Sequence, residues 1–359
     1  MMKDNYCIIM GGGIGSRFWP FSKEDRPKQF LDFFGVGRSL IQQTFDRFSQ
    51  LIPVENIYIA TNKSYAALVK EQLPEITDNQ ILLEPTRRNT APCIAYASYR
   101  IQSINPNANI VVTPADHLIL NEHNFLKNIQ KGLNFVAKFP SLLTLGVKPN
   151  RPETGYGYIQ TQEGGTDNIQ KVKTFTEKPN YELAKVFFEK GEFFWNSGIF
   201  IWNVQTIIEA FRKYLPDVAN RLDQGLNIYN TPQEEAFIKE YYPMFQNISI
   251  DYGIMEKAEN AYMLMADFGW SDLGTWGSLY DISEKDENQN VALKCKSLFI
   301  DSGNNLLTLP ENKLAVIQGL DDYIVAESDD ILLICKKSDE QRIKQFVADV
   351  AMKYGEDYL

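Results

Sequence analysis

The N-terminal stretch reads Asn5-Tyr6-Cys7-Ile8-Ile9-Met10-Gly11-Gly12-Gly13-Ile14-Gly15-Ser16-Arg17. An apolar run that leads directly into four glycines is typical of a buried strand followed by a loop. Glycine carries no Cβ and adopts positive φ freely, so a ligand can approach the backbone closely. Successive exposed N–H groups in such a loop form a nest for an anion. The stretch therefore predicts a phosphate-binding loop, and the alternative is an ordinary strand-to-helix turn with several glycines.

Two other glycine-rich loops compete with this interpretation. A dinucleotide-binding fingerprint needs a third glycine where this sequence has Ser16, and an acidic residue where the next strand ends in Thr61-Asn62-Lys63. Pro20 and Pro27 also disfavour the long helix that would have to follow. A P-loop needs Gly-Lys-Ser or Gly-Lys-Thr at a spacing that does not occur here. The cations Arg17 and Lys28 instead favour a nucleoside triphosphate.

The first half of the chain predicts an open α/β sandwich. Short apolar runs alternate with longer amphipathic stretches, which is typical of a parallel sheet that is buried on both faces. One helix is expected to begin near Thr90, with this threonine as its N-cap and Pro92 in its first turn. The predicted strands are Tyr6–Met10, Ile57–Thr61, Ile81–Glu84, Ile110–Thr113 and Leu142–Val147.

The second half of the chain has a different pattern of predicted strands and helices. Strands are expected at Tyr156–Thr161, Ile169–Thr176 and Phe193–Trp202, a helix at Tyr181–Lys190, and mainly helices from Val204 to Lys257. The polar stretch 283–290 is typical of a linker, so we predict two domains, residues 1–283 and 284–359. Short strands with tight turns indicate a small β-rich C-terminal domain that closes on a helix from Asp339 to Tyr354. Its predicted strands are Ser297–Ile300, Leu306–Leu309, Leu314–Ile317, Tyr323–Glu327 and Ile331–Cys335.

Composition excludes several classes of protein. The 359 residues carry a formal net charge of -10, which repels nucleic-acid backbones and anionic lipid, so we expect no nucleic-acid and no membrane partner. The N-terminal apolar run is too short for a signal sequence or a membrane span. The four cysteines lie far apart without a Cys-x-x-Cys pair, so neither a zinc site nor a disulfide framework is expected. Reduced thiols favour a cytoplasmic location.

Two aspartates have the surroundings of metal ligands. Asp116 follows the predicted strand Ile110–Thr113, and ligands of open α/β sheets bind where parallel strands end. Asp272 lies between glycines and tryptophans in the stretch 269–276. Phosphoryl transfer between two phosphate-bearing substrates needs a divalent cation held by one or two carboxylates. The alternative is structural: a helix cap or turn for Asp116, and an N-cap for Asp272.

These motifs together resemble those of the sugar-phosphate nucleotidyltransferases. The resemblance rests on 11–20 with 27–30 and covers roughly residues 5 to 280. It implies a Rossmann-like open mixed sheet flanked by helices, the nucleotide-diphospho-sugar transferase fold, with a small C-terminal β-helix-like domain. It also implies that Arg17 and Lys28 neutralise the transferring phosphates, and that Asp116 and Asp272 hold Mg2+. Nucleotide binding would fall to the loop residues Gly11, Gly12, Gly13, Gly15 and Ser16.

The segment 84–92 concerns the choice of base. Guanine offers N–H donors that a carboxylate can accept, and Glu84 would supply one; the alternative is a loop whose arginines are solvated. The run from Arg88 to Pro92 resembles the motif of the guanylyltransferases within the family. The resemblance therefore implies GTP as substrate, with Glu84, Arg88 and Asn89 on the nucleotide side.

Three further segments, 153–158, 176–179 and 195–200, resemble the part of the family that binds the sugar. Each also has a structural alternative, such as a β-bulge or a surface ion pair. The segment 249–256 resembles the family too, but the sequence assigns Asp251 no role. The residues that the resemblance places on the sugar phosphate are Gly155, Glu177, Lys178 and Asn196.

The implied reaction transfers GMP from GTP to mannose 1-phosphate and releases pyrophosphate, by in-line attack of the sugar phosphate on the α-phosphorus. Because this nucleophile is already anionic, positioning and charge stabilisation suffice. The alternatives are a transferase with another sugar 1-phosphate or nucleotide, and a non-catalytic sugar-nucleotide sensor. The resemblance also allows a homodimer.

Overall fold

The structure is a computed structural model that describes residues 2–13, 15–162, 164–165 and 167–359. It divides into two compact units. The first unit consists of Met1–Gly12, Thr44–Ala115 and Ile119–Trp270, and the second of Gly13–Gln43, Asp116–Leu118 and Ser271–Leu359. The second unit thus takes in two N-terminal segments as well as the C-terminal part. The division at 283/284 stays a prediction.

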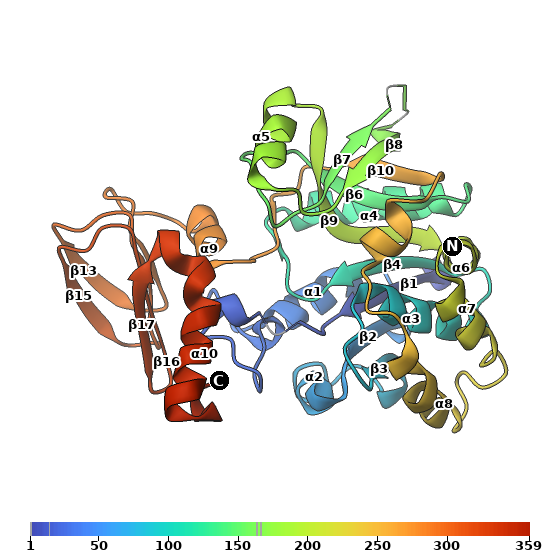
Figure 1. Cartoon of the computed structure of the whole chain (residues 1–359), viewed down its shortest axis with the longest axis horizontal. Coiled ribbons are helices and arrows are strands. Elements are labelled where there is room, and N and C mark those ends of the chain that lie inside the picture. Colours follow the sequence, from blue (N-terminus) through green and yellow to red (C-terminus); the bar gives the residue numbers. More distant parts are fainter. Residues whose placement is uncertain (1, 14, 163, 166) are drawn as a thin grey trace. The chain divides into compact units, whose positions relative to one another are not determined.

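The first unit contains a nine-stranded mixed sheet in the order β3-β2-β1-β4-β9-β6-β10-β8-β7 (Figure 1). Its β1–β4 half is parallel, while β9 runs antiparallel to both β4 and β6. The mixed α/β class predicted from the sequence is confirmed. The strands are β1 (Asn5–Met10), β2 (Ile57–Asn62), β3 (Ile81–Glu84), β4 (Asn109–Pro114), β6 (Leu142–Val147), β7 (Tyr158–Thr161), β8 (Ile169–Thr176), β9 (Phe193–Asn203) and β10 (Ala261–Met265).

Helices cover both faces of this sheet. Tyr6 and Ile8 of β1 belong to one apolar cluster with residues of α3 and α6, whereas the alternate residues Cys7 and Ile9 are buried on the other face. That face packs closely under α4, because a Cβ on Gly132 would lie 2.4 Å from the Ile201 side chain. The helices are α1 (Leu40–Ser49), α2 (Ala66–Gln72), α3 (Thr90–Ile104), α4 (Glu122–Val136), α5 (Tyr181–Lys190), α6 (Val204–Tyr214), α7 (Pro216–Asp223) and α8 (Glu234–Tyr241).

Two local expectations were wrong or incomplete. The N-cap of α3 is Asn89, not Thr90: the Asn89 side chain accepts a hydrogen bond from the Thr90 amide. The hydroxyl of Thr90 is engaged elsewhere, as an acceptor for the amide of Ile250 at 2.9 Å. The strand β10, which pairs with β6 and β8, is a second difference, because the sequence predicts no strand there.

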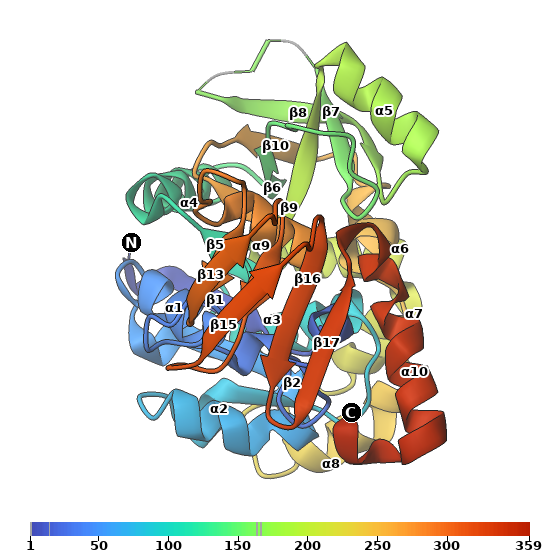
Figure 2. The same ribbon diagram turned by 90° about the vertical axis from the view of Figure 1, so that its left-hand side faces the viewer.

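The second unit is rich in short strands (Figure 2). β12, β14 and β16 pair in parallel, β17 closes their sheet antiparallel to β16, and β13 pairs in parallel with β15. An apolar cluster joins β14, β16 and β17 to residues that include Phe18, Trp276 and Ile343. The elements are β12 (Val291–Leu293), β13 (Lys296–Ile300), β14 (Leu306–Thr308), β15 (Leu314–Gln318), β16 (Tyr323–Ser328), β17 (Ile331–Lys336), α9 (Trp276–Ile282) and α10 (Ile343–Tyr354). The β-rich character is as expected, while the β-helix-like form stays a prediction.

The two-residue strands β5 (Leu118–Ile119) and β11 (Trp270–Ser271) lie where the chain passes between the units. In the described part of the chain, no helix is long and apolar enough to cross a membrane.

Candidate functional site

The glycine-rich loop begins where β1 ends. The Gly11 amide donates to Ala60 O at 2.8 Å, so it still belongs to the sheet and is not available to a ligand. The amides of Gly12, Gly13 and Gly15 have no acceptor among the described residues, which leaves three donors for an anion. Ile14 lies outside the described residues.

Gly15 is required by its surroundings. Its φ is +70°, in the left-handed region, and a Cβ there would lie 2.5 Å from the Cβ of Lys28. Gly15 therefore packs directly against the Lys28 side chain. Ser16 and Arg17 follow in a short 3-10 helix, and Arg17 Nε donates to the Gln341 side chain at 3.1 Å.

Lys28 is the most constrained cation of the candidate site. It is only 4% exposed, and its ammonium donates to three oxygens: Asp116 Oδ2 at 2.9 Å, Asp272 O at 2.7 Å and Leu273 O at 2.9 Å. An ammonium has three hydrogens, so every one of them has a partner. Lys28 thereby contacts both of the residues that the sequence predicts as metal ligands.

Asp116 lies directly after β4. The strands β1 and β4 end together, with Met10 opposite Pro114, and the Ala115 amide donates to Met10 O. The predicted position of a carboxylate at the end of a parallel strand is thus confirmed, and Asp116 caps no helix, because α4 starts at Glu122 with Asn121 as its cap. Burial alone would raise the pKa of Asp116, but Lys28 and His117 outweigh it and hold the pKa below its usual range.

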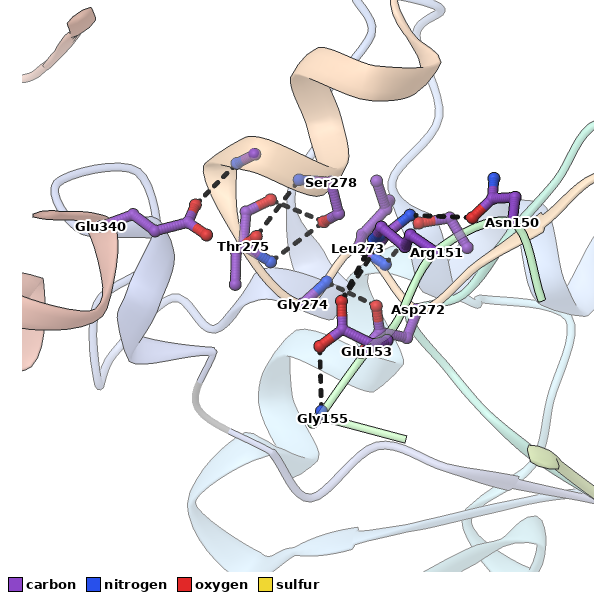
Figure 3. A network of polar contacts seen from close by, with 12 residues as sticks. Asn150, Arg151, Glu153, Gly155, Asp272, Leu273, Gly274, Thr275, Ser278 and Glu340 are labelled. Carbon is purple, nitrogen blue, oxygen red and sulfur yellow. Dashed lines mark hydrogen bonds and ion pairs between the residues drawn. The ribbon is translucent and has the colours of Figure 1, made fainter. Parts of the chain in front are cut away.

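Asp272 sits in a tight turn ahead of α9 (Figure 3). Its Oδ1 accepts the Gly274 amide at 2.9 Å, and a Cβ on Gly274 would lie 2.6 Å from Oδ2. Leu273 has a φ of +46°, which is costly for a non-glycine residue and tends to occur at functional sites. The N-cap of α9 is Thr275, so Asp272 is not the cap that the sequence left as an alternative.

Glu84 lies in the first unit at the end of β3 and is 7% exposed. The hydroxyl of Tyr242 donates to its Oε1, and its Oε2 would lie 3.5 Å from a Cβ built on Gly12. The absence of a side chain at position 12 therefore leaves space beside this oxygen. Burial raises the pKa of Glu84, although the Tyr242 hydroxyl and Arg87 partly oppose that effect.

The two other residues predicted on the nucleotide side, Arg88 and Asn89, also make contacts that stabilise the fold. Arg88 Nη2 donates to Pro243 O, and Asn89 caps α3 with a φ of +66°. Arg88 Nε and Thr86 Oγ1 are buried without a hydrogen-bond partner in the described part of the chain. Buried polar atoms nearly always have partners, so these two atoms are open to water or to a ligand.

Of the residues predicted on the sugar side, Lys178 and Asn196 lie beside Glu177 in the first unit. Its side chain is 7% exposed and pairs with Lys178 at 3.0 Å, while the Lys178 side chain is 60% exposed with a φ of +45°. A Cβ on Gly157 would lie 2.5 Å from Glu177 Oε2, so this carboxylate needs a glycine beside it. Gly155 is exposed, and its amide donates to Glu153 Oε1 at 2.9 Å (Figure 3).

Asn196 contacts a residue to which the sequence assigned no role. Asn196 Nδ2 donates to Asp251 Oδ1 at 2.9 Å. The segment around Asp251 resembles the family. The hydrogen bond between Asn196 and Asp251, however, joins residues 55 positions apart, so no local sequence pattern predicts it. Asp251 therefore joins Glu177, Lys178 and Asn196 as a fourth polar residue of this group.

The sequence as a whole agrees with this arrangement of a glycine-rich loop, a buried lysine and two aspartates that the lysine contacts. Residues 6–289 match the protein family described as nucleotidyl transferase. The chain belongs to this family of enzymes.

Its relatives have narrower names. The mannose-1-phosphate guanylyltransferase of Escherichia coli is 34% identical over 95% of this chain and 74% of its own length. Mannose-1-phosphate guanylyltransferase 2 of Escherichia coli O157:H7 is 36% identical over 98% of this chain and 75% of its own length. A crystal structure from Thermus thermophilus, described as a mannose-1-phosphate geranyltransferase, has a TM-score of 0.88 at 29% identity and covers 97% of this chain and 99% of that one.

Proposed function

We propose that the chain transfers GMP from GTP to mannose 1-phosphate, giving GDP-mannose and pyrophosphate. The names of the relatives with 34% and 36% identity support the choice of substrates. The geometric observation that carries the proposal is the Lys28 ammonium, which lies within hydrogen-bond distance of both Asp116 Oδ2 and Asp272 O. A buried cation that contacts the Asp116 carboxylate and the Asp272 backbone carbonyl suits a reaction that gathers several phosphate charges.

Asp116 and Asp272 are the residues that would hold Mg2+. Their carboxylates are hard oxygen donors, and Mg2+ in such sites takes one or two carboxylates together with phosphate oxygens and water. No group of three or more metal-ligating side chains occurs among the described residues, which agrees with a metal that substrate phosphates help to hold. When bound, the metal would neutralise charge on the phosphates. The free amides of Gly12, Gly13 and Gly15, with Arg17, would bind the leaving pyrophosphate.

The choice of guanine falls to Glu84 and Arg88. Glu84 Oε2 is the carboxylate oxygen that the Tyr242 hydroxyl does not engage, and guanine presents N–H donors to such an acceptor. The unpartnered Arg88 Nε is a donor for the nucleotide. On the sugar side, Glu177 accepts from hydroxyls, Lys178 binds the sugar phosphate, and Asn196 and Gly155 line the ring.

The remaining proposals concern the cellular location and the oligomeric state of the protein. All four cysteines are free thiols, which suits a cytoplasmic enzyme. A homodimer finds support in apolar side chains on β13 and β15, where Leu298 lies opposite Val316 and both are more than half exposed. Sedimentation analysis tests the homodimer, and a purely monomeric protein would contradict it.

A crossed assay of pyrophosphate release tests the function. GTP, ATP, UTP and dTTP are each combined with mannose 1-phosphate, glucose 1-phosphate and other sugar 1-phosphates, with and without Mg2+. The proposal expects metal-dependent release that is fastest with GTP and mannose 1-phosphate. Turnover only with another nucleotide would refute the choice of base, and GTP binding without any release would favour a sensor.

A further inference from the structure

Asp251 occupies a distinctive position in the backbone. It is the first residue of a π-helical turn, Asp251–Met255, a conformation that is rare and often marks functional sites. The preceding segment is fixed to the start of α3: the Ile250 amide donates to Thr90 Oγ1 at 2.9 Å, and the Ala91 amide donates to Ile248 O at 3.1 Å. The position of Asp251 is therefore tied to the segment that is proposed to bind the nucleotide.

The Asn196 side chain orients Asp251. Its Oδ1 accepts the Thr144 hydroxyl at 2.8 Å and the Gly198 amide at 3.3 Å, so the amide group has one orientation that satisfies both donors. That orientation turns Nδ2 towards Asp251 Oδ1, at 2.9 Å. Among the described residues, no side chain donates to the second oxygen, Oδ2. Asn196 thus fixes Oδ1 of this carboxylate, and no other described side chain competes with a ligand for Oδ2.

The charges around Asp251 indicate what kind of ligand fits. Glu177 adds a second carboxylate, while Lys178 supplies the ammonium that pairs with Glu177 at 3.0 Å. Burial and, next to it, the charge of Glu177 raise the pKa of Asp251 to about 7, and Lys178 opposes them. Glu256, which accepts the Glu177 amide at 3.2 Å, is a third acidic group. Beside the two carboxylates of Asp251 and Glu177 an anionic group is disfavoured, whereas neutral hydroxyl groups can donate hydrogen bonds to them.

We propose that Asp251 is a specificity-determining residue that binds a ring hydroxyl of the sugar 1-phosphate through Oδ2. Asn196 and Thr144 then act as positioning residues for Asp251, and the sugar ring is held between two carboxylates, those of Asp251 and Glu177. This inference rests on the proposed function, because it presumes that a sugar 1-phosphate binds beside Glu177. It adds Asp251 to the residues that bind the sugar. It also predicts that a sugar analogue without the hydroxyl that Asp251 binds loses this hydrogen bond and its contribution to affinity.

The test compares Asp251→Asn with the unaltered enzyme on mannose 1-phosphate and on its 2-, 3-, 4- and 6-deoxy analogues. We expect KM for mannose 1-phosphate to rise about 10- to 100-fold, since a charged hydrogen bond to the sugar is lost, while KM for GTP changes less than about twofold. With one of the deoxy analogues, both enzymes should have the same KM. Equal losses on every analogue, unchanged KM for the sugar, or a matching rise for GTP would each overturn the proposal.

Two further variants make the result specific. Asp217→Asn makes the same change on the exposed first turn of α7 and should leave all constants unchanged. Thr144→Val releases Asn196 Oδ1 without touching Asp251, and should raise KM for mannose 1-phosphate in the same direction but by less; it also serves if Asp251→Asn does not fold. Calorimetric binding of mannose 1-phosphate gives a readout apart from turnover.

The same experiment distinguishes a failure of the proposed function from a failure of the role of Asp251. If the unaltered enzyme uses a different sugar 1-phosphate, the proposed function fails, and the comparison is repeated with that sugar and its deoxy analogues. If mannose 1-phosphate is the substrate but no hydroxyl shows the dependence on Asp251, only the role of Asp251 fails.

Discussion

Replacing Lys28 by methionine removes the ammonium and keeps an unbranched apolar stem of similar length. The change breaks a 2.9 Å ion pair with Asp116 and two hydrogen bonds to the carbonyls of Asp272 and Leu273. Breaking a buried ion pair costs about 3–5 kcal/mol. The Asp116 side chain is 28% exposed, so water partly compensates it, and we expect the free energy of unfolding to fall by about 2–4 kcal/mol. Thermal unfolding of the 359-residue chain followed by circular dichroism should show a Tm lower by roughly 3–5 °C.

The matched control is Lys23→Met in the same unit. Lys23 pairs with Asp329 at 2.8 Å, but the Asp329 side chain is 69% exposed, so this pair contributes at most about 1 kcal/mol. The Lys28 variant should also lose turnover, because the oxygens of Asp116 and Asp272 are no longer held by one cation. Equal melting temperatures for the two variants would show that the contacts of Lys28 do not stabilise the fold. Lys28 would then be better explained as a phosphate ligand alone.

Three other predictions concern the carboxylates. Asp116→Asn and Asp272→Asn should each lower kcat by at least about 100-fold while the protein stays folded, and near-normal turnover at limiting Mg2+ would show that the two do not form a metal site. Glu84→Gln should raise KM for GTP about 10- to 100-fold and leave KM for mannose 1-phosphate unchanged, which steady-state kinetics with either substrate varied would check. The pKa of Asp251 is raised from 3.8 to about 7, so the folded state holds its proton more tightly, and the stability from that proton is lost as pH rises from 4 to 8. Asp251→Asn cannot ionise and should therefore gain stability relative to the unaltered protein over this range, by about 1–3 kcal/mol; urea unfolding at pH 4, 6 and 8 would contradict this if the difference stayed constant.

Local patterns in the sequence predict most strands of the first unit and one of its helices with its bounds. The helix Tyr181–Lys190 and the strand Ile169–Thr176 are confirmed without a shift, because turn residues stand at both ends of each. The strand Ala261–Met265 was missed, since a short apolar run after helical residues cannot be told from the end of a helix by periodicity. The insertion of this strand between β6 and β8 is set by long-range pairing, which no local pattern contains.

The candidate site was predictable in its residue types but not in its contacts. The sequence indicates that Lys28 and Asp272 have chemical roles, yet they are 244 positions apart, and only the folded chain places the Asp272 carbonyl on the Lys28 ammonium. A lysine expected to meet phosphate is thereby occupied by carboxylate and carbonyl oxygens. Asp251 is the converse case: its chemistry depends on Asn196 and on burial, and neither can be read from its neighbours in sequence.

Phosphorus NMR of a mixture of the protein, GTP, mannose 1-phosphate and Mg2+ tests the central claim most directly. We expect the resonances of GTP and mannose 1-phosphate to decline together, while those of GDP-mannose and pyrophosphate grow in equal amounts. The claim is contradicted if GTP and mannose 1-phosphate persist while another nucleotide or another sugar 1-phosphate is consumed under the same conditions.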